Sequence, residues 1–296
     1  MYYIGIDGGG TKTIFCLFKE NIRIQTIELT TCHFAQVGFD GCANILKQGI
    51  DCLLERESIK LSEVIIGAGI AGYGNDSKLR LQIKEAIVEL MPHYQIHLTN
   101  DIHIALLGTL GGQDGITIID GTGAIAMAKV GDRIERIGGW GYQLGDEGSG
   151  YWIGKQMLSE FTKQADGRTS KTKLYQAIKE HFKLSDDYQI IAFINNCQNI
   201  RTEIARLAKL CDTLAKDEDP VCLSILDKAA YEISLFVEGL RKHYQNKPLV
   251  SYYGSVFNSE IFLKNVQNYL EDITLMTPEF DALYGAYLFV LENIKN

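Results

Sequence analysis

A glycine-rich turn near the N-terminus, Asp7–Thr13 (DGGGTKT), combines residue types that can bind phosphate and a cation. Apolar, β-rich runs lie on both sides of it, so the sequence predicts a strand, a tight turn and a returning strand. Glycines lack a Cβ and let backbone N–H groups approach an anion closely, while Thr11, Lys12 and Thr13 add donors. Asp7, at the end of the first strand, could hold a hydrated cation. Taken alone, an ordinary hairpin turn would be the simpler interpretation.

The same pattern recurs in the stretch 116–129, ITIIDGTGAIAMAK. A strand again ends in an aspartate, Asp120, and a second strand returns after Gly121, Thr122 and Gly123. Two such hairpins, roughly one domain apart, are difficult to attribute to chance. The recurrence therefore favours two phosphate-binding turns over two ordinary hairpins.

Asp101 follows Asn100 at the end of a strand predicted at 95–98, where α/β proteins place their ligands. A carboxylate there can accept the proton of a substrate hydroxyl. The alternative is that Asp101 only caps the helix predicted at 102–110. Because the chain also carries the two phosphate turns, we favour the catalytic role.

The stretch 138–154, GGWGYQLGDEGSGYWIG, contains seven glycines and both tryptophans of the chain. This composition is not that of a strand or helix interior. The aromatic face of Trp140 can pack on the apolar surface of a sugar, while Asp146 and Glu147 accept hydrogen bonds from its hydroxyls. We therefore predict a sugar-binding loop, with a purely structural turn as the alternative.

A further glycine pattern, GAGIAG at 67–72, matches the dinucleotide fingerprint and follows a strand predicted at 63–67. In that fingerprint the helix begins within the glycines, so that its N-terminus faces the pyrophosphate. Here the helix is predicted to begin only after Asp76, and no strand ending in an acidic ribose ligand follows at the expected distance. We interpret 67–74 as a flexible loop that faces a ligand.

The predicted strands and helices alternate as in the α/β class. The first half is expected to have the order βββαβαβ up to residue 101, with a loop at 31–41 before a helix from about residue 45. Residues 108–115 are expected to be a hinge between the halves. The second half is expected to contain the hairpin 116–130, a strand at 133–137, helices within 172–243, a strand at 249–253, a helix at 258–271, a strand at 273–276 and a terminal helix.

Composition excludes several classes of protein. The chain of 296 residues is long enough for two domains, and its net charge of −8 argues against a nucleic-acid-binding face. No signal peptide and no apolar run of membrane-spanning length are evident, so we expect a cytoplasmic protein with no membrane partner. The seven cysteines lack zinc and iron–sulfur spacing and are expected to be free thiols in a reducing compartment.

Six motifs, taken in order, resemble the N-acetylglucosamine kinase branch of the BadF/BadG/BcrA/BcrD ATPase family, which lies within the actin, sugar kinase and Hsp70 superfamily. They are DGGGTKT, NDIHIALLG, IIDGTGAIA, GGWGYQLGDEGSGYWIG, YYGSVF and PEFDALYGAY. The resemblance implies two ribonuclease-H-like (actin-like ATPase) α/β domains with a cleft between them, the second enlarged by helices. It implies an N-terminal sugar and phosphate-loop domain at 1–113, a C-terminal nucleotide-binding domain at 114–277, and a helix at 278–296 that returns to the first domain.

The resemblance also implies roles for individual residues. The first phosphate loop would comprise Asp7, Gly8, Gly9, Gly10, Thr11, Lys12 and Thr13, and the second Gly121, Thr122 and Gly123. Ala205, Gly254 and Ser255 would lie by the adenine. Asp101 would be the catalytic base, and the sugar would be bound by Asn100, Asp101, Gly139, Trp140, Gly141, Asp146 and Glu147. Asp7 and Asp120 would hold Mg²⁺ through water.

The implied reaction transfers the γ-phosphate of MgATP to a hydroxyl of an amino sugar, with ATP and Mg²⁺ as cofactors. N-acetylglucosamine is the first expectation; glucosamine and N-acetylmuramic acid stay open, as does a homodimer. Three departures from the family pattern leave the particular sugar undecided: Cys32-His33-Phe34 where an asparagine is common, Ala124 where the family has serine, and Ile125 where some members have asparagine.

Two other functions compete with the kinase. An ATPase activator of a CoA-ester dehydratase needs a cysteine cluster shared by two subunits, and no suitable adjacent pair of cysteines occurs in this sequence. A non-catalytic ATP- or sugar-binding regulator would be expected to carry an added DNA-binding region, whereas this sequence begins directly at the first phosphate-loop strand. Both features favour the kinase.

Overall fold

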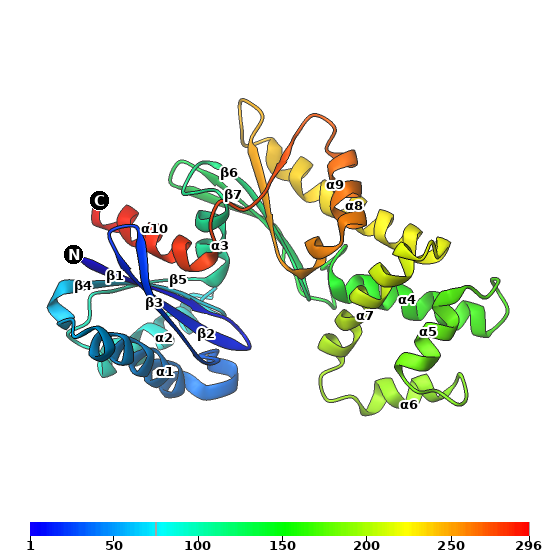
Figure 1. The fold of residues 1–296 in the computed structure, drawn as a ribbon, viewed down its shortest axis with the longest axis horizontal. Coiled ribbons are helices and arrows are strands. Elements are labelled where there is room, and N and C mark those ends of the chain that lie inside the picture. The colour runs from blue at the N-terminus through cyan, green and yellow to red at the C-terminus, as the bar shows by residue number, and fades with distance from the viewer. Residues whose placement is uncertain (75, 296) are drawn as a thin grey trace. The chain divides into compact units, whose positions relative to one another are not determined.

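The computed structural model describes residues 1–74 and 76–295, which divide into two compact units (Figure 1). Unit 1 comprises residues 1–114 and the C-terminal segment from Thr277. Unit 2 comprises Gly115–Met276. Each unit is built on one five-stranded sheet with helices packed against it, so the predicted α/β fold class is confirmed.

Unit 1 carries its strands in the order β3-β2-β1-β4-β5. The strands are β1 (Tyr2–Gly8), β2 (Lys12–Lys19), β3 (Ile22–Thr30), β4 (Val64–Ile70) and β5 (Ile96–Thr99). The first three form an antiparallel meander, and β4 and β5 continue the sheet in parallel from β1. The helices are α1 (Phe34–Glu57), α2 (Ser77–Leu90), α3 (Asp101–Thr109) and α10 (Ala282–Lys295), with a short 3₁₀ turn, η1, at Leu61–Glu63.

Helices cover both faces of this sheet, with α1 and α2 on one face and α3 and α10 on the other (Figure 1). Alternate side chains of a strand point to opposite faces. Accordingly Phe15 belongs to the core formed with α1 and α2, whereas Phe18 packs on Tyr287 of α10. Helix α10 lies very close to the sheet. A Cβ placed on Gly67 would stand only 2.4 Å from the carbonyl oxygen of Ala286, so the close approach depends on glycine at this position.

Unit 2 repeats this topology, with the order β10-β9-β6-β7-β8. The strands are β6 (Gly115–Asp120), β7 (Ala124–Val130), β8 (Arg133–Gly138), β9 (Leu249–Tyr253) and β10 (Leu275–Met276). Again three strands form an antiparallel meander, and two strands join in parallel on the other side of the first. The repeated pair of glycine turns in the sequence therefore corresponds to a repeated arrangement of strands.

Six α-helices of the described chain enlarge unit 2. They are α4 (Gly150–Ala165), α5 (Lys173–His181), α6 (Gln189–Asn196), α7 (Ile200–Lys216), α8 (Pro220–Arg241) and α9 (Glu260–Tyr269), with a 3₁₀ turn, η2, at Ser255–Asn258. Ile116 and Ile118 of β6 share one buried core with Ile233 and Val237 of α8. Helix α4 packs on α7 and α8, so the walls of unit 2 near the β6–β7 turn are helical.

Three expected boundaries were wrong. The loop expected at 67–74 overlaps the end of β4, which continues to Ile70. Residues 31–41 were expected to be a loop, but α1 already begins at Phe34. His33 caps this helix through Nδ1, which accepts a hydrogen bond from the Ala35 N–H, and Gly38 with φ of 74° interrupts the helical geometry. Histidine is not among the usual capping residues. The predicted hinge at 108–115 overlaps the end of α3, which continues to Thr109.

No helix among the described residues is long and apolar enough to cross a lipid bilayer. All seven cysteines are free thiols, as the sequence predicted.

Candidate active site

The first glycine turn joins β1 to β2 and is held by hydrogen bonds to its carbonyl oxygens. The Gly9 N–H donates to the Lys12 carbonyl at 3.0 Å. The Thr31 hydroxyl donates to the Gly9 carbonyl at 2.9 Å, and the Gln36 amide donates to the Gly10 carbonyl at 2.7 Å. A Cβ placed on Gly10 would meet no atom within 4 Å. The turn is therefore fixed from behind and open at Gly10, where a phosphate could approach the backbone.

Two side chains of this turn make other contacts. Thr13 is fully buried, and its hydroxyl accepts a hydrogen bond from the Cys32 N–H at 2.9 Å. Lys12 forms an ion pair with Glu28 at 2.7 Å, and both side chains are more than half exposed. Thr13 thus positions the turn against the residues after β3. The phosphate-binding role predicted for these two residues stays a prediction.

Three aspartates of unit 1 interact electrostatically: Asp7 at the end of β1, Asp101 at the start of α3, and Asp281 before α10. Burial raises the pKa of Asp7 from 3.8 to about 6, with further contributions from Asp101 and Asp281 and an opposing one from Lys12. Burial also raises the pKa of Asp101, opposed by the N–H groups of Ile102 and Asp101 itself and by His33. A carboxylate with a raised pKa is a better proton acceptor at neutral pH than a fully solvated one.

The residue that caps α3 is Asn100, not Asp101. The Asn100 Oδ1 atom accepts a hydrogen bond from the His103 N–H at 2.6 Å. The alternative in which Asp101 is the N-cap of this helix is therefore wrong, although its carboxyl still interacts with the N–H groups of Ile102 and Asp101. The amide oxygen of Asn100 is thus occupied by the helix cap, directly before Asp101 in the chain.

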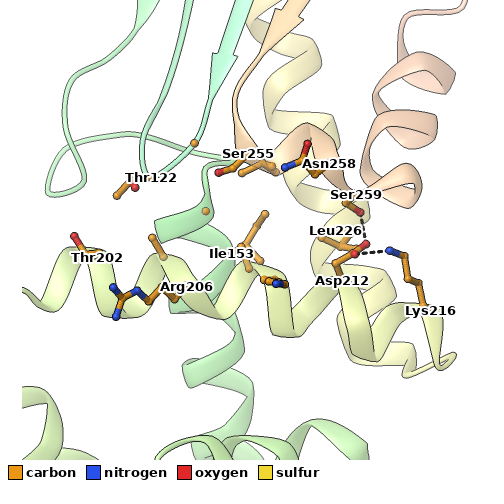
Figure 2. A pocket seen from close by; sticks show the side chains of 16 residues that line it. Thr122, Ile153, Thr202, Arg206, Asp212, Lys216, Leu226, Ser255, Asn258 and Ser259 are labelled. Atoms are coloured by element: carbon orange, nitrogen blue, oxygen red, sulfur yellow. Dashed lines mark hydrogen bonds and ion pairs between the residues drawn. The ribbon is translucent and has the colours of Figure 1, made fainter. Parts of the chain in front are cut away.

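A cavity of about 480 Å³ lies within unit 2 (Figure 2). Four residues predicted to bind nucleotide line it: Gly121, Thr122, Ala205 and Ser255. They come from the β6–β7 turn, from α7, and from the turn after β9. Figure 2 shows Thr122 and Thr202 at one end and Asp212, Lys216 and Ser259 at the other. Three of the predicted segments thus line one cavity, whose complete lining the sequence did not predict.

The residues that sequence reasoning missed lie mainly on one face of α7. They are Thr202, Arg206, Ala208, Lys209, Asp212 and Lys216, joined by Asn258 and Ser259. The Ser259 hydroxyl donates to Asp212 Oδ1 at 2.5 Å, and Lys216 donates to Asp212 Oδ2 at 2.7 Å. Spacings of three and four residues place side chains on one helix face. Polar residues at that spacing around Ala205 were the sequence signal that could have identified this face of α7 as part of a site.

Gly254 lies behind the cavity instead of lining it. Its φ of 115° is one that side-chain-bearing residues rarely adopt, and a Cβ there would stand 2.1 Å from the carbonyl oxygen of Asp120. Glycine is required because the turn after β9 packs directly on the end of β6. Gly254 therefore positions Ser255 in the pocket wall.

Asp120 is fully buried, and neither carboxylate oxygen has a hydrogen-bond partner among the described residues. Burial, and secondarily the charge of Asp146, raises its pKa well above the ordinary value. A buried carboxylate without a partner is costly, so such a group is usually satisfied by a proton, by water or by a cation. The donor type and its unmet bonding capacity fit the predicted water-mediated Mg²⁺ role.

The glycine-rich loop presents Trp140 to solvent. Its side chain is 67% exposed, and the Arg136 guanidinium lies 5.3 Å from the centre of its ring. Gly139 and Gly141 on either side have φ of 68° and 84°, values that favour glycine. An exposed tryptophan is not a core residue, so packing does not account for Trp140.

Asp146, predicted to bind sugar, lies against the second glycine turn. Its side chain is 3% exposed and accepts a hydrogen bond from Arg201 Nη2 at 3.2 Å. A Cβ on Gly123 would stand 2.5 Å from Asp146 Oδ2. Asp146 also adopts φ of 61°, in the left-handed region, so the backbone aims this carboxylate at the turn at a conformational cost.

The chain is similar to known proteins over nearly its full length. The chain is 29% identical over 309 residues to the N-acetylmuramic acid/N-acetylglucosamine kinase of Clostridium acetobutylicum, covering 97% of each. It is 29% identical over 318 residues to the N-acetyl-D-glucosamine kinase of Dictyostelium discoideum, covering 99% of this chain and 98% of the relative. A crystal structure of a proposed N-acetylglucosamine kinase from Chromobacterium violaceum superposes with a TM-score of 0.80 at 26% identity, covering 97% of this chain and 98% of that one.

The model of one protein family matches residues 4–290, which is nearly the whole chain and includes both glycine turns. All the candidate residues described above fall within this range, as do both five-stranded sheets except for Tyr2 and Tyr3 at the start of β1. The chain belongs to the BadF/BadG/BcrA/BcrD ATPase family.

Proposed function

We propose that this protein is an ATP-dependent kinase of amino sugars that transfers the γ-phosphate of MgATP to a hydroxyl of an N-acetylhexosamine. The observation that carries the proposal is the cavity of unit 2, which Gly121, Thr122, Ala205 and Ser255 line together. The resemblance to the family implied a nucleotide-binding role for these four residues, among others. The similarity to two amino sugar kinases over nearly the full length supports the same conclusion.

In the proposed reaction the two glycine turns hold phosphates. Gly10 leaves its side of the first turn open, and Thr122 lies at the end of the cavity in unit 2. Backbone N–H groups in such turns bind anions without a side chain. Phosphoryl transfer requires mainly positioning and neutralisation of charge, so a fixed turn contributes directly to the rate.

Asp7 and Asp120 are the carboxylates proposed to hold Mg²⁺ through water. Both are desolvated, Asp7 beside other acids and Asp120 without any hydrogen-bond partner in the described chain. Bound Mg²⁺ supplies charge neutralisation at the phosphate oxygens. The residues keep the ion's water ligands oriented and need not contact it directly.

Asp101 is the proposed general base. It lies at the first position of α3, capped by its neighbour Asn100 and not itself required as a cap. Its raised pKa increases its ability to accept the proton of the attacking hydroxyl.

For the sugar, we propose a binding role for the loop that carries Trp140 and Asp146. Trp140 offers an exposed aromatic face, and Asp146 offers a carboxylate that is largely shielded from solvent. N-acetylglucosamine is the first candidate, with N-acetylmuramic acid and glucosamine as the sugars to compare. We also propose a cytoplasmic location.

A coupled assay of ADP release tests the proposal. The purified protein is mixed with MgATP and, separately, N-acetylglucosamine, N-acetylmuramic acid, glucosamine and glucose, with EDTA as the control for Mg²⁺. We expect ADP release that depends on an amino sugar and stops with EDTA. ATP hydrolysis that no sugar stimulates would contradict the kinase and favour an ATPase activator of the same family. Binding of ATP and sugar without turnover would favour a non-catalytic regulator.

A further inference from the structure

Arg201 lies at the second glycine turn, beside the cavity of unit 2, although it is not part of any motif that the sequence indicated. It is the second residue of α7, directly before Thr202, which lines the cavity opposite Thr122. Its Nη2 atom would stand 2.7 Å from a Cβ placed on Gly123. The guanidinium therefore covers the second glycine turn at the point where the backbone carries no side chain.

The ion pair that Arg201 makes is only partly satisfied. Nη2 donates a single hydrogen bond of 3.2 Å to Asp146, whereas charge-assisted bonds of this kind are commonly about 2.7–2.9 Å and often bidentate. The Nε atom is buried and has no hydrogen-bond partner among residues 1–74 and 76–295. The side chain as a whole is 42% exposed. The Nη2 atom thus fixes the guanidinium at the turn, while the Nε–H group can still donate a hydrogen bond.

The surroundings hold the guanidinium in this place. It lies 5.5 Å from the centre of the Tyr142 ring, and Tyr142 in turn packs edge-on against Tyr151 near the start of α4. The charge of Asp146 adds to burial in raising the pKa of Asp120 at this turn. A carboxylate beside the turn would repel approaching phosphate oxygens unless a cation lies beside it. Arg201 is a cation in that position.

We propose that Arg201 binds the terminal phosphates of ATP at the second glycine turn, exchanging its contact with Asp146 for phosphate oxygens. This rests on the proposed function. A planar guanidinium presents Nε and Nη donors together, which matches two phosphate oxygens better than one carboxylate oxygen. The exchange also releases the Asp146 carboxylate, so that nucleotide binding makes available the acceptor proposed for the sugar. Arg201 acts as a phosphate-binding residue and links the two substrates.

The competing explanation is that Arg201 only neutralises Asp146. The two explanations differ in what happens when Asp146 loses its charge. If neutralisation is the whole role, removing both charges restores the turn and ATP binds normally. If Arg201 contacts phosphate, ATP binding stays weak when both charges are absent, because the donor is still missing.

Titration calorimetry with MgATP, MgADP and adenosine distinguishes these explanations. The proteins are the wild type, Arg201→Gln, Arg201→Lys, the double variant Arg201→Gln with Asp146→Asn, and Arg168→Gln. Arg168 pairs with Asp166 at an exposed site of the same unit and is the matched control for losing an arginine–aspartate pair.

We expect Arg201→Gln to weaken ATP binding by about 10- to 100-fold, as for loss of a hydrogen bond to a charged group. Adenosine affinity should change less than about twofold, because adenosine carries no phosphate. Arg201→Lys should retain part of the affinity, the double variant should stay weak, and Arg168→Gln should match the wild type.

Equal ATP affinity in the wild type and Arg201→Gln would overturn the assignment of Arg201 while leaving the proposed function intact. Recovery of ATP affinity in the double variant, or an equal loss for adenosine and ATP, would reduce Arg201 to a structural partner of Asp146. A wild type that binds no ATP would overturn the proposed function and this inference together.

Discussion

Asp7, which we propose to hold Mg²⁺ through water, lowers the stability of the fold when it is ionised. Burial and two neighbouring acids raise its pKa to about 6, compared with an ordinary value of 3.8. The folded protein therefore binds a proton that the unfolded chain has released. The favourable contribution of protonated Asp7 is complete below pH 4 and is lost as the pH rises through 6.

Asp7→Asn should therefore stabilise unit 1 at pH 8, by about 1–3 kcal/mol, because it removes a charge that folding desolvates. The same variant should show no gain at pH 4, where the wild-type carboxyl is protonated. Thermal melts at the two pH values measure this difference. Asp40→Asn, at an exposed position on α1, is the control and should show no pH-dependent gain. A stability loss at pH 8 would show that ionised Asp7 is stabilised by its surroundings.

Asp101→Asn preserves the shape of the side chain but removes the proton acceptor. We expect kcat to fall by about 100- to 10,000-fold, the usual contribution of a general base. Sugar affinity should stay within about tenfold, because the lost interaction belongs mainly to the transition state. Steady-state kinetics combined with sugar-binding titration measure the two effects. Turnover near that of the wild type would remove Asp101 from this role.

At the scale of elements, the two glycine turns differ in what surrounds them. Gly10 faces open space, whereas a side chain on Gly123 would collide with Asp146 and Arg201. A Gly123 variant would therefore disturb the protein itself, and loss of ATP binding would be ambiguous. The first turn offers the cleaner experiment.

Gly10→Val should weaken MgATP binding by about tenfold or more while leaving the melting temperature almost unchanged. The reason is that the new side chain meets no protein atom but occupies the place proposed for the phosphates. Calorimetric titration with MgATP and a thermal melt provide the two readings. Unaltered ATP affinity would mean that the first turn does not bind phosphate.

The loop that carries Trp140 leads to a fluorescence prediction. Sugar alone should change the tryptophan emission of the wild type, because an exposed indole becomes covered by the pyranose. Trp140→Phe should lose most of that change, whereas Trp152→Phe, a half-buried residue packed on the unit 2 core, should keep it. Asp146→Ala should raise the sugar KM by about 5- to 100-fold. If the sugar response persists in Trp140→Phe, the sugar binds elsewhere.

Elements with local signals could be predicted, and those that depend on tertiary contacts could not. Helix α2 begins directly after Asp76, as expected, and the Asp76 carboxylate accepts hydrogen bonds from two N–H groups of its first turn. The first turns of α1 were missed because its cap is His33 and they contain Gly38 with φ of 74°. The polar spacing on α7 did not by itself identify the cavity lining, because which elements face α7 is decided by tertiary packing.

At the scale of the whole molecule, the repeated hairpin predicted a repeated fold, and both sheets have the same strand order. Turn chemistry is local, so Asp7–Thr13 and the turn at 121–123 could be recognised from their residues alone. The contact between Asp146 and Arg201 could not, because it joins a loop to the start of α7. The glycine turns of the candidate site can thus be predicted from sequence motifs, whereas the contacts around them depend on packing within each unit.

The central claim is transfer of a phosphoryl group to an amino sugar, and ATP labelled in its γ-phosphate tests it most directly. The protein is incubated with labelled MgATP and N-acetylglucosamine, and the products are separated and identified by mass spectrometry, with Asp101→Asn as the matched inactive variant. The account predicts that the label appears in a sugar phosphate, in proportion to the ADP formed, and only with the wild type. Label found solely in inorganic phosphate, with no labelled product from any amino sugar, would contradict it.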